Sequence, residues 1–352
     1  MKYRSSSNTF NFINFNNFNK TAIFHTTVFF LIQPPVYTQN MKRTIKNSLL
    51  MICLLSLELL ATNQVSAQEA MCEYEVLSSL PVSFGSGNRL PIIEGEINQK
   101  PATLLLDTGA NLTYIMPEAA EKFNLFVGKP SSTINGIGGS TSRSVTKLNS
   151  LAIGNIRVDK PYLFVLNGMG FTPYFDAIAG ADYLLQSDLE INLQQKEIKF
   201  YRAKNCTTYP APAWATTAVP FLEADKNDDR PHFVITINNE KFVAIIDTAA
   251  ERSMLSTVAA KRIGIDPASG TLTQGGTAVG AGTGKEKTWT TTLDEVKIGE
   301  LILKNQKIMI SQLPVNDNGT IEILLGKDFL MHHRALFSMG SRQLYIAKFP
   351  AT

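Results

Sequence analysis

The segments ATLLLDTGA at residues 102–110 and VAIIDTAA at residues 243–250 are two copies of one pattern. Each is a run of apolar residues that ends in Asp-Thr, with the aspartates at Asp107 and Asp247. A continuous apolar run of this length, bounded by a turn, predicts a strand that is buried on both faces. The pattern therefore predicts two interior strands, each of which delivers a carboxylate into a tight turn.

A second pair of matching segments follows the aspartates. The sequence AIAGADYLL at residues 177–185 matches ILLGKDFLM at residues 323–331, and both units end in similar segments, 196–201 and 342–346. Recurrence of several landmarks in the same order is the signature of an internal repeat. The chain is therefore expected to contain a duplicated unit.

Each unit is expected to consist mostly of β-strands. Strand-like stretches precede the two apolar runs, and each ends in a polar turn. These stretches are residues 90–97 and 232–237, and short helices are expected at residues 117–123, 182–186, 256–263 and 328–332. The expected organisation is a lobe at residues 80–205, a linker with several prolines at 206–218, and a second lobe at 219–349.

Composition and charge indicate a globular protein and argue against a nucleic-acid partner. The chain has 352 residues, of which 44% are hydrophobic, and a formal net charge of +3. The basic excess belongs to residues 1–67, because the rest of the chain carries 27 Lys and Arg against 29 Asp and Glu. No basic surface for nucleic acid is therefore expected.

Residues 41–67 have the three parts of a secretory signal peptide. Basic residues begin the segment, an apolar core follows at residues 49–61, and Val65-Ser66-Ala67 offers a cleavage site. The core is shorter than the ~20 residues of a membrane span, so cleavage is favoured over anchoring. Residues 1–40 are a doubtful extension rich in Asn and Phe, and we expect translation to begin at Met41. The sequence thus predicts an exported protein, periplasmic or secreted, without a membrane attachment after cleavage.

Export also bears on the cysteines. Cys53 lies in the predicted signal, which leaves Cys72 and Cys206. Two cysteines in an exported chain are expected to pair, and closing so long a loop contributes roughly 4–5 kcal/mol in the chain-entropy description. The alternative is two unrelated thiols.

The placement of the two aspartates suggests a chemistry. A buried carboxylate is unfavourable unless it is hydrogen-bonded or shares a proton. If the two copies face each other, their carboxyl groups hold one proton between them, because like charges a few ångströms apart do not both ionise. One carboxylate then acts as general base on a water and the other as general acid. This chemistry requires no metal and no cofactor.

Other polar residues receive structural interpretations. Asp182 and Asp328 are expected to cap helices. The pair His332-His333 is expected at an exposed helix end, because no third metal ligand has suitable spacing. Residues 225–230, DKNDDR, are interpreted as a solvated hairpin loop in preference to a calcium site.

Taken together, these features make the sequence resemble the aspartic proteases, and the retroviral-type family more closely than the pepsins. Ala110 and Ala250 stand where pepsins usually carry Ser or Thr. The apolar-apolar-Gly segments resemble the second motif of that family, and two glycine-rich segments resemble its flap. The matching residues are Ile178, Gly180, Leu324 and Gly326 in the second motifs, Gly136, Ile137, Gly138 and Gly139 in the first flap, and Val279, Gly280, Ala281 and Gly282 in the second.

The resemblance implies a mostly β, two-lobed fold with a pseudo-two-fold axis, in a monomer that carries both half-sites on one chain. It implies that Asp107 and Asp247 form the catalytic dyad and that Thr108 and Thr248 bond across the axis. Gly109 would offer its N–H to the dyad. Both flaps would close over an extended peptide or unfolded protein, which binds as an added strand.

The second copy departs from the family at Ala249, where glycine is nearly invariant. If the turn requires a positive φ there, alanine costs on the order of 1 kcal/mol. The substitution is expected to be absorbed, and the missing hydroxyls at Ala110 and Ala250 predict a pH optimum less acidic than that of pepsin. Two alternatives stay open: an inactive peptide-binding protein on the same fold, and a β-rich envelope protein without a cleft.

Overall fold

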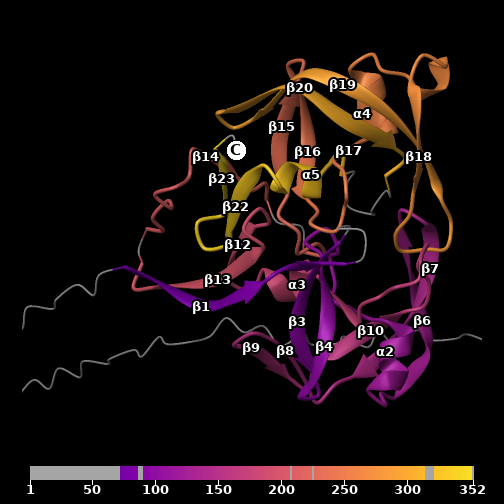
Figure 1. Ribbon diagram of the computed structural model, residues 1–352, viewed down its shortest axis with the longest axis vertical. Helices are drawn as coiled ribbons and strands as arrows, with labels where there is room; N and C mark the ends of the chain where they lie inside the picture. The colour runs from indigo at the N-terminus through magenta and orange to yellow at the C-terminus, as the bar shows by residue number, and fades with distance from the viewer. Residues whose placement is uncertain (1–71, 86–89, 207, 224–225, 314–320, 351–352) are drawn as a thin grey trace, which may run out of the picture. The chain divides into compact units, whose positions relative to one another are not determined.

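The two apolar runs of the repeat form strands β4 (Lys100–Leu106) and β16 (Glu240–Ile246) of the computed structural model (Figure 1). Both strands have the same succession of exposed and buried residues, and the last three residues of each are buried. The structure describes residues 72–85, 90–206, 208–223, 226–313 and 321–350. The predicted extension at 1–40 and the predicted signal peptide at 41–67 lie outside these residues. The described residues all belong to one compact part of the chain, Glu69–Thr352, which contains both copies of the repeat.

Each apolar run follows a tight hairpin. Strands β3 (Pro91–Ile97) and β15 (Phe233–Ile237) pair antiparallel with β4 and β16. The connecting residues have positive φ, 52° and 65° at Asn98 and Gln99 and 51° and 65° at Asn238 and Asn239. Two consecutive positive φ values define the turn that matches the twist of a two-residue hairpin, so the polar turns of the sequence have a direct structural reason.

The repeat also determines how each run is buried. Strand β11 (Ala177–Ala179) lies parallel to β4, and β21 (Ile323–Leu325) lies parallel to β16. These strands pair antiparallel with β5 (Tyr114–Ile115) and β17 (Met254–Ser256), which lie parallel to β10 (Tyr162–Leu166) and β20 (Leu301–Ser311). Identical pairing in both units confirms the duplication predicted from the sequence.

The other elements complete two mostly β lobes. The N-terminal lobe adds β2 (Ser83–Phe84), α2 (Pro117–Lys122), β6 (Val127–Gly136), β7 (Gly139–Lys147), β8 (Ser150–Ile153), β9 (Ile156–Asp159) and α3 (Ala181–Leu184). The C-terminal lobe adds α4 (Thr257–Arg262), the 3₁₀ turn η2 (Pro267–Ser269), β18 (Thr273–Ala278), β19 (Glu286–Ile298) and α5 (Lys327–Leu330). The sheet of this lobe curves back on itself, because β15 pairs with both β16 and β19.

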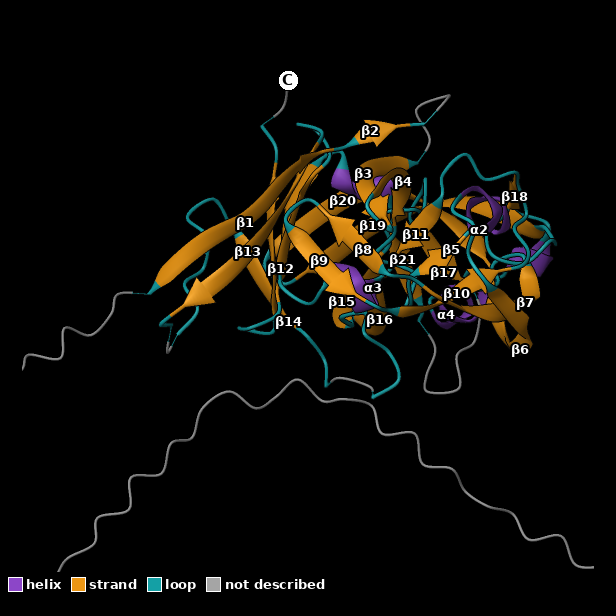
Figure 2. Cartoon of the chain, turned by 90° about the horizontal axis from the view of Figure 1, so that it is seen from below, coloured by secondary structure: helices purple, strands orange, loops and turns teal. Residues whose placement is uncertain are grey.

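A sheet shared by both lobes joins the two units. Its strand order is β1 (Glu73–Pro81), β13 (Glu197–Lys204), β12 (Asp188–Asn192), β22 (His333–Ser338), β23 (Gln343–Lys348) and β14 (Thr217–Pro220). Figure 2 shows β1, β13 and β12 side by side in this sheet. The lobes meet at its centre, where Leu189 is paired with Phe337. Residues 217 and 218, expected in the linker, begin β14.

The core extends through both units. Phe200, Phe233, Phe242 and Phe337 are its largest fully buried side chains. The four expected helices are present, and Ser256 caps α4 by accepting a hydrogen bond from the backbone N–H of Ala259. Among the described residues, no helix is both long enough and apolar enough to cross a membrane.

Candidate active site

Asp107 and Asp247 occupy equivalent positions at the ends of β4 and β16. The backbone N–H of Asp107 donates to the carbonyl oxygen of Ala179 at 3.1 Å, and that of Asp247 donates to Leu325 at 2.9 Å. Each aspartate is thus fixed where its strand leaves the neighbouring parallel strand. The apolar run of the sequence therefore positions each carboxyl group by ordinary sheet pairing.

Thr108 and Thr248 connect the two loops. The backbone N–H of Thr108 donates to Oγ1 of Thr248 at 3.0 Å, and that of Thr248 donates to Oγ1 of Thr108 at 3.2 Å. Each hydroxyl in turn donates across the lobe boundary, Thr108 to the carbonyl of Ile246 and Thr248 to that of Leu106. Both threonines are buried, so these four hydrogen bonds hold the loops together without competition from water.

Both carboxyl groups are held in the same way by their own loops. Oδ1 of Asp107 accepts from the backbone N–H groups of Gly109 and Ala110, and Oδ1 of Asp247 accepts from those of Ala249 and Ala250, all at 2.9–3.0 Å. The second oxygen, Oδ2, of each aspartate makes no hydrogen bond within its own loop. One oxygen of each carboxyl group is thus used to orient it.

The two loops are in close contact at Gly109. A Cβ atom at this position would lie 2.3 Å from Cγ of Asp247, closer than any non-bonded carbon atoms approach. Glycine is therefore required by the proximity of the opposite carboxyl group. Neither Gly109 nor Ala249 has a positive φ, so the backbone strain considered for Ala249 does not arise.

The environment of the two carboxyl groups favours their neutral forms. Burial and the charge of Asp247 raise the pKa of Asp107 to about 8, although the two backbone N–H groups act in the opposite direction. Burial likewise raises the pKa of Asp247 above its ordinary value, 3.8. Two neighbouring carboxyl groups in such surroundings retain a proton at a pH where exposed aspartates have lost theirs.

A second pair of hydroxyl residues supports the loops. Thr113 donates to Oδ1 of Asp182 at 2.6 Å and accepts from the N–H of Gly180. Ser253 makes the equivalent bonds with Asp328 and Gly326, at 2.7 and 3.0 Å. The prediction that these aspartates cap helices is wrong, because the N-cap residues are Gly180 and Gly326.

Close backbone approach explains the glycines of the second motifs. A Cβ at Gly180 would lie 2.4 Å from the backbone of Leu112, and one at Gly326 would lie 2.7 Å from the carbonyl oxygen of Ala250. The preceding apolar residues, Ile178 and Leu324, are buried. The second motif thus packs directly beneath the loop that follows each aspartate.

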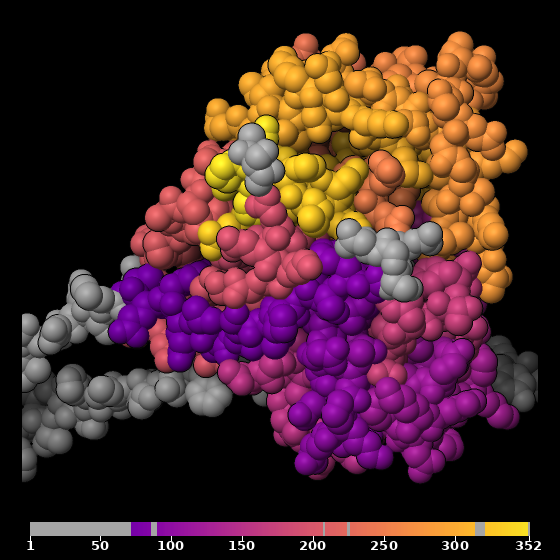
Figure 3. Space-filling view, in the orientation of Figure 1, coloured from indigo at the N-terminus to yellow at the C-terminus, as the bar shows by residue number. Residues whose placement is uncertain are grey.

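Both predicted flaps are hairpins, and their tips are hydrogen-bonded to each other. The N-terminal flap is formed by β6 and β7 and the C-terminal flap by β18 and β19. The N–H of Gly138 donates to the carbonyl of Ala281 at 2.8 Å, and the N–H of Gly284 donates to the carbonyl of Gly138 at 2.8 Å. The hairpins meet at the right of Figure 1, and their surfaces are in contact in the space-filling view (Figure 3).

The flap glycines serve this contact. A Cβ at Gly136 would lie 2.5 Å from the carbonyl oxygen of Ala281, and one at Gly138 would lie 2.4 Å from that of Gly282. Gly139 and Gly282 also have positive φ values, 90° and 93°. A side chain at most of these positions would therefore separate the tips.

A third segment, which the sequence did not single out, completes the contact. The loop after β10 binds the C-terminal flap on both sides: Gly282 donates to the carbonyl of Gly168 at 3.0 Å, and Gly170 donates to the carbonyl of Gly280 at 2.8 Å. Val279 contacts the same loop, since a Cβ at Gly170 would lie 3.0 Å from its Cβ. The sequence signal that could have indicated this contact is the pair of glycines on either side of Met169.

Arg230 was also missed: the solvated loop expected at residues 225–230 is confirmed for the exposed residues Lys226, Asn227 and Asp229, but it is wrong for Asp228 and Arg230. Nη1 of Arg230 donates to the carbonyl oxygen of Gly109 at 3.1 Å, and Nη2 lies 2.5 Å from Oδ2 of Asp228. Only 11% of the Arg230 side chain and 9% of the Asp228 side chain are exposed. Burial would raise the pKa of Asp228, but the hydrogen bonds from Arg230 and the nearby His232 ring, with Nε2 3.4 Å from Oδ2, outweigh it and lower that pKa.

The expectation for His332-His333 is half correct. His332 is exposed, but His333 begins β22 and is 4% exposed, with its ring stacked on Phe329. Nδ1 of His333 lies 2.9 Å from the carbonyl oxygen of Phe329. Within the described ranges, no group of three or more His, Cys, Asp or Glu side chains is arranged to hold a metal ion.

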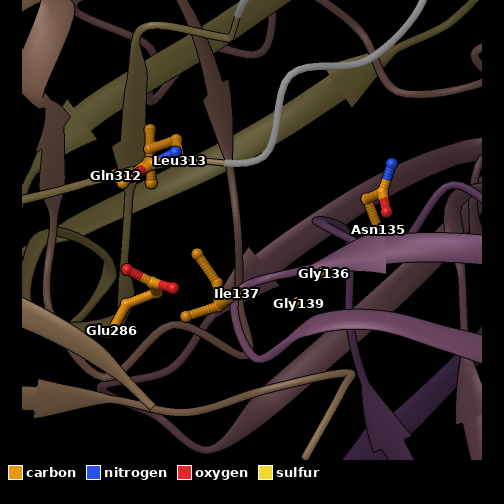
Figure 4. Close-up of a pocket in the computed structure, with 7 residues that line it drawn as sticks. All are labelled: Asn135, Gly136, Ile137, Gly139, Glu286, Gln312 and Leu313. Atoms are coloured by element: carbon orange, nitrogen blue, oxygen red, sulfur yellow. The ribbon is translucent and has the colours of Figure 1, made fainter. Parts of the chain in front are cut away.

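A pocket of about 290 Å³ lies beside the flap tips (Figure 4). Its lining residues come from the N-terminal flap, from the start of β19 and from the segment that follows β20: Asn135, Gly136, Ile137, Gly139, Glu286, Gln312 and Leu313. Leu313 belongs to an apolar cluster that contains Ile245 of β16 and its partner Leu324 of β21, and Ile137 packs against this cluster. The tip of the N-terminal flap therefore reaches the wall of the opposite lobe.

Cys72 and Cys206 form the predicted disulfide, which joins residues 134 positions apart. The bond ties the beginning of β1 to the segment that follows β13. It therefore fixes the outer edge of the shared sheet and lies away from the loops of the dyad.

The two-lobed β fold and the paired aspartates are those of the aspartic proteases, and comparison with known proteins identifies the family. The aspartyl protease family model matches residues 93–182 and 234–329, one match in each unit and more than half of the chain together. The chain belongs to this family of aspartyl proteases. The sequence had predicted this resemblance, to retroviral-type aspartic proteases with both half-sites on one chain.

Among solved structures, the chain is similar to an aspartic proteinase from Irpex lacteus. The two share 12% sequence identity with a TM-score of 0.49, and the match covers 78% of this chain and 97% of the other. A search of curated proteins finds no match.

Proposed function

We propose that the chain is an aspartic endopeptidase that hydrolyses peptide bonds with a water activated between Asp107 and Asp247. The observation that carries the proposal is the equivalence of the two loops, in which each aspartate has one oxygen held by two backbone N–H groups. The carboxyl pair retains a shared proton. One carboxylate then takes a proton from the attacking water while the other donates to the scissile carbonyl, so neither a metal nor a covalent intermediate is required.

The substrate is an extended peptide or unfolded protein segment. Such a segment binds between the dyad and the flaps as an added strand, with main-chain hydrogen bonds along its length and side chains in alternating pockets. The flap tips are joined by backbone hydrogen bonds, which must open for a chain to enter. The glycines at the tips give the backbone the conformational freedom for this movement.

The second candidate is a peptide-binding protein without catalysis, and Ala249 is the residue that favours it. The geometry around Ala249 argues for activity instead. Its backbone N–H donates to Oδ1 of Asp247 at 3.0 Å, the same distance as between Gly109 and Asp107. Because the methyl group leaves this hydrogen bond intact, we favour the enzyme.

The deciding experiment measures cleavage of an unfolded protein between pH 3 and pH 8. Pepstatin-sensitive cleavage is expected for the wild-type protein, with losses of at least 1,000-fold, on the order of 4 kcal/mol of transition-state stabilisation, in Asp107→Asn and in Asp247→Asn. Asp159→Asn, on an exposed residue of β9, is the matched control and should retain activity. Binding of peptides without turnover would select the second candidate. If the protein neither cleaves nor binds peptides, the third interpretation stands, a β-rich protein without an active site.

We also propose that the protein is exported to the periplasm or the exterior and acts there as a monomer. The disulfide between Cys72 and Cys206 supports an oxidising compartment, since such bonds persist mainly outside the cytosol. Sizing of the purified protein and fractionation of cells that express the full chain test these two points.

A further inference from the structure

The pocket beside the flap tips contains one acidic side chain, Glu286. This residue begins β19, directly after the tip loop of the C-terminal flap, and Figure 4 shows its carboxylate directed toward the space bounded by Ile137, Gln312 and Leu313. The other walls of the pocket are the flap backbone, the apolar side chains of Ile137 and Leu313, and the amide side chains of Asn135 and Gln312. A single carboxylate in such surroundings determines which charge the pocket accepts.

The register of the flap directs Glu286 to the inner face of the hairpin. Glu286 is paired with Ala278 of β18, and directly paired residues project from the same face of a sheet. Ala278 is buried and belongs to the apolar cluster with Ile245 and Leu324. Lys287 projects from the opposite face by strand alternation and is exposed. The neighbouring lysine is therefore directed away from the pocket.

Among the ion pairs found in the described residues, none includes Glu286. Its side chain is half-buried, so the charge is partly desolvated and the attraction for an incoming cation is stronger than at an open surface. The polar amides of Asn135 and Gln312, both exposed, line the same pocket and supply further hydrogen-bonding groups.

We propose that this pocket is a specificity site that takes a lysine or arginine side chain of the peptide. A long basic side chain has an apolar stem and a cationic end, which match the apolar wall formed by Ile137 and Leu313 and the carboxylate of Glu286. Acidic side chains are excluded by repulsion. This inference rests on the proposed peptidase function, because it assigns a substrate preference to that site.

The test uses peptides that differ only in charge at one position. Arginine, citrulline, norleucine and glutamate are placed in turn at each of six positions around the cleaved bond, and kcat/KM is measured for each peptide. Citrulline has the shape of arginine without its charge. Wild-type protein should prefer arginine to citrulline about tenfold at one position, as expected for a charge-assisted contact, and should cleave the glutamate peptide more slowly than either.

Variants of Glu286 assign the effect. Glu286→Gln should reduce the arginine-to-citrulline ratio to within twofold, and Glu286→Lys should reverse the preference toward glutamate. Glu300→Gln, which removes a charge from an exposed residue of the same lobe, should leave the ratio unchanged. A ratio that is unaltered in Glu286→Gln overturns the inference.

Failure of the peptidase function is a separate outcome. If wild-type protein cleaves no peptide and no unfolded protein, the proposed function fails, and fluorescence anisotropy with the same labelled peptides measures the pocket directly. A tenfold tighter binding of the arginine peptide that disappears in Glu286→Gln then supports the pocket assignment. Equal binding of the arginine and citrulline peptides contradicts it.

Discussion

Thr108 and Thr248 exchange hydrogen bonds across the boundary between the two lobes, each accepting from the backbone N–H of the other. Each also donates to a carbonyl oxygen at the end of the opposite apolar strand. The two aspartates that precede them are thereby held in register by the chain itself. The hydrogen bonds are symmetric, so a change to either threonine affects both loops.

Thr248→Val is expected to destabilise the fold because it removes a hydroxyl that no water can replace. The N–H of Thr108 and the carbonyl oxygen of Leu106 would both lose a partner in the interior. At about 1–3 kcal/mol for each unsatisfied group, the free energy of unfolding should fall by about 2–6 kcal/mol. Denaturant titration measures the change. Thr248→Ser retains the hydroxyl and is the control, and equal losses in Val and Ser would contradict the hydrogen-bond explanation.

Gly109→Ala and Ala249→Gly are expected to differ sharply although they change equivalent positions. A methyl group at residue 109 would meet the carboxyl group of Asp247 at 2.3 Å, so we expect kcat/KM to fall at least 100-fold, about 2.7 kcal/mol. Ala249→Gly removes a methyl group that already fits, so kcat/KM should change less than threefold. A large gain in Ala249→Gly would mean that the methyl group impairs catalysis.

Activity should depend on pH in a way that follows from the carboxyl pair. The reaction requires one protonated and one ionised carboxyl group. Because the pKa of Asp107 is raised to about 8 and that of Asp247 is raised above 3.8, kcat/KM should increase as pH rises from 3 and decrease above about 8. Initial rates at constant ionic strength measure the profile. A rate that continues to increase as the pH is lowered below 3 would contradict the predicted upward pKa shifts.

The same shifts predict a change in stability with pH. Between pH 3.8 and about 8, the folded protein binds a proton at Asp107 that the unfolded chain has released, so stability falls as pH rises through this window. Asp107→Asn removes this dependence. The variant should gain stability over wild type toward pH 8, by up to about 6 kcal/mol at about 1.36 kcal/mol per pH unit. Thermal unfolding at pH 4 and pH 8 is the measurement, and a constant difference would argue against the buried proton.

Arg230→Met should destabilise the protein by about 3 kcal/mol, because Asp228 would remain buried without its strongest partner. The double variant Asp228→Asn with Arg230→Met removes the stranded charge and should recover much of the loss. Unfolding free energies of the two single variants and the double variant form a cycle that isolates the pair. Equal losses in the Arg230→Met and double variants would indicate that the contact with the carbonyl oxygen of Gly109 dominates.

The sequence predicted those parts of the site that depend on local pattern and repetition. Asp107 and Asp247 follow buried strands, and the duplicated landmarks around them predicted the repeated unit and its short helices. The equivalence of Thr113 and Ser253 could have been predicted, since each is a hydroxyl residue six positions after an aspartate. Their hydrogen bonds to Asp182 and Asp328 are evident only in the structure. Capping was the wrong interpretation because a glycine precedes each helix in the N-cap position.

Contacts between distant segments were not predictable from the sequence. DKNDDR is as suited to water as to a buried ion pair, and only the folded chain brings Arg230 to Gly109, 121 positions away. The bonds from Gly168 and Gly170 to the C-terminal flap have the same origin. His333 was misjudged because the exposure of a strand residue depends on what packs over it, here Phe329.

The covalent joining of the two half-sites has a consequence for evolution as well as for assembly. Dilution cannot separate Asp107 from Asp247, since the encounter that brings them together is intramolecular. Each copy is also free to accumulate its own substitutions, as Gly109 beside Ala249 and Ile137 beside Ala281 illustrate. Two identical subunits would have to present the same residues on both sides of the dyad, whereas this chain presents different residues on the two sides.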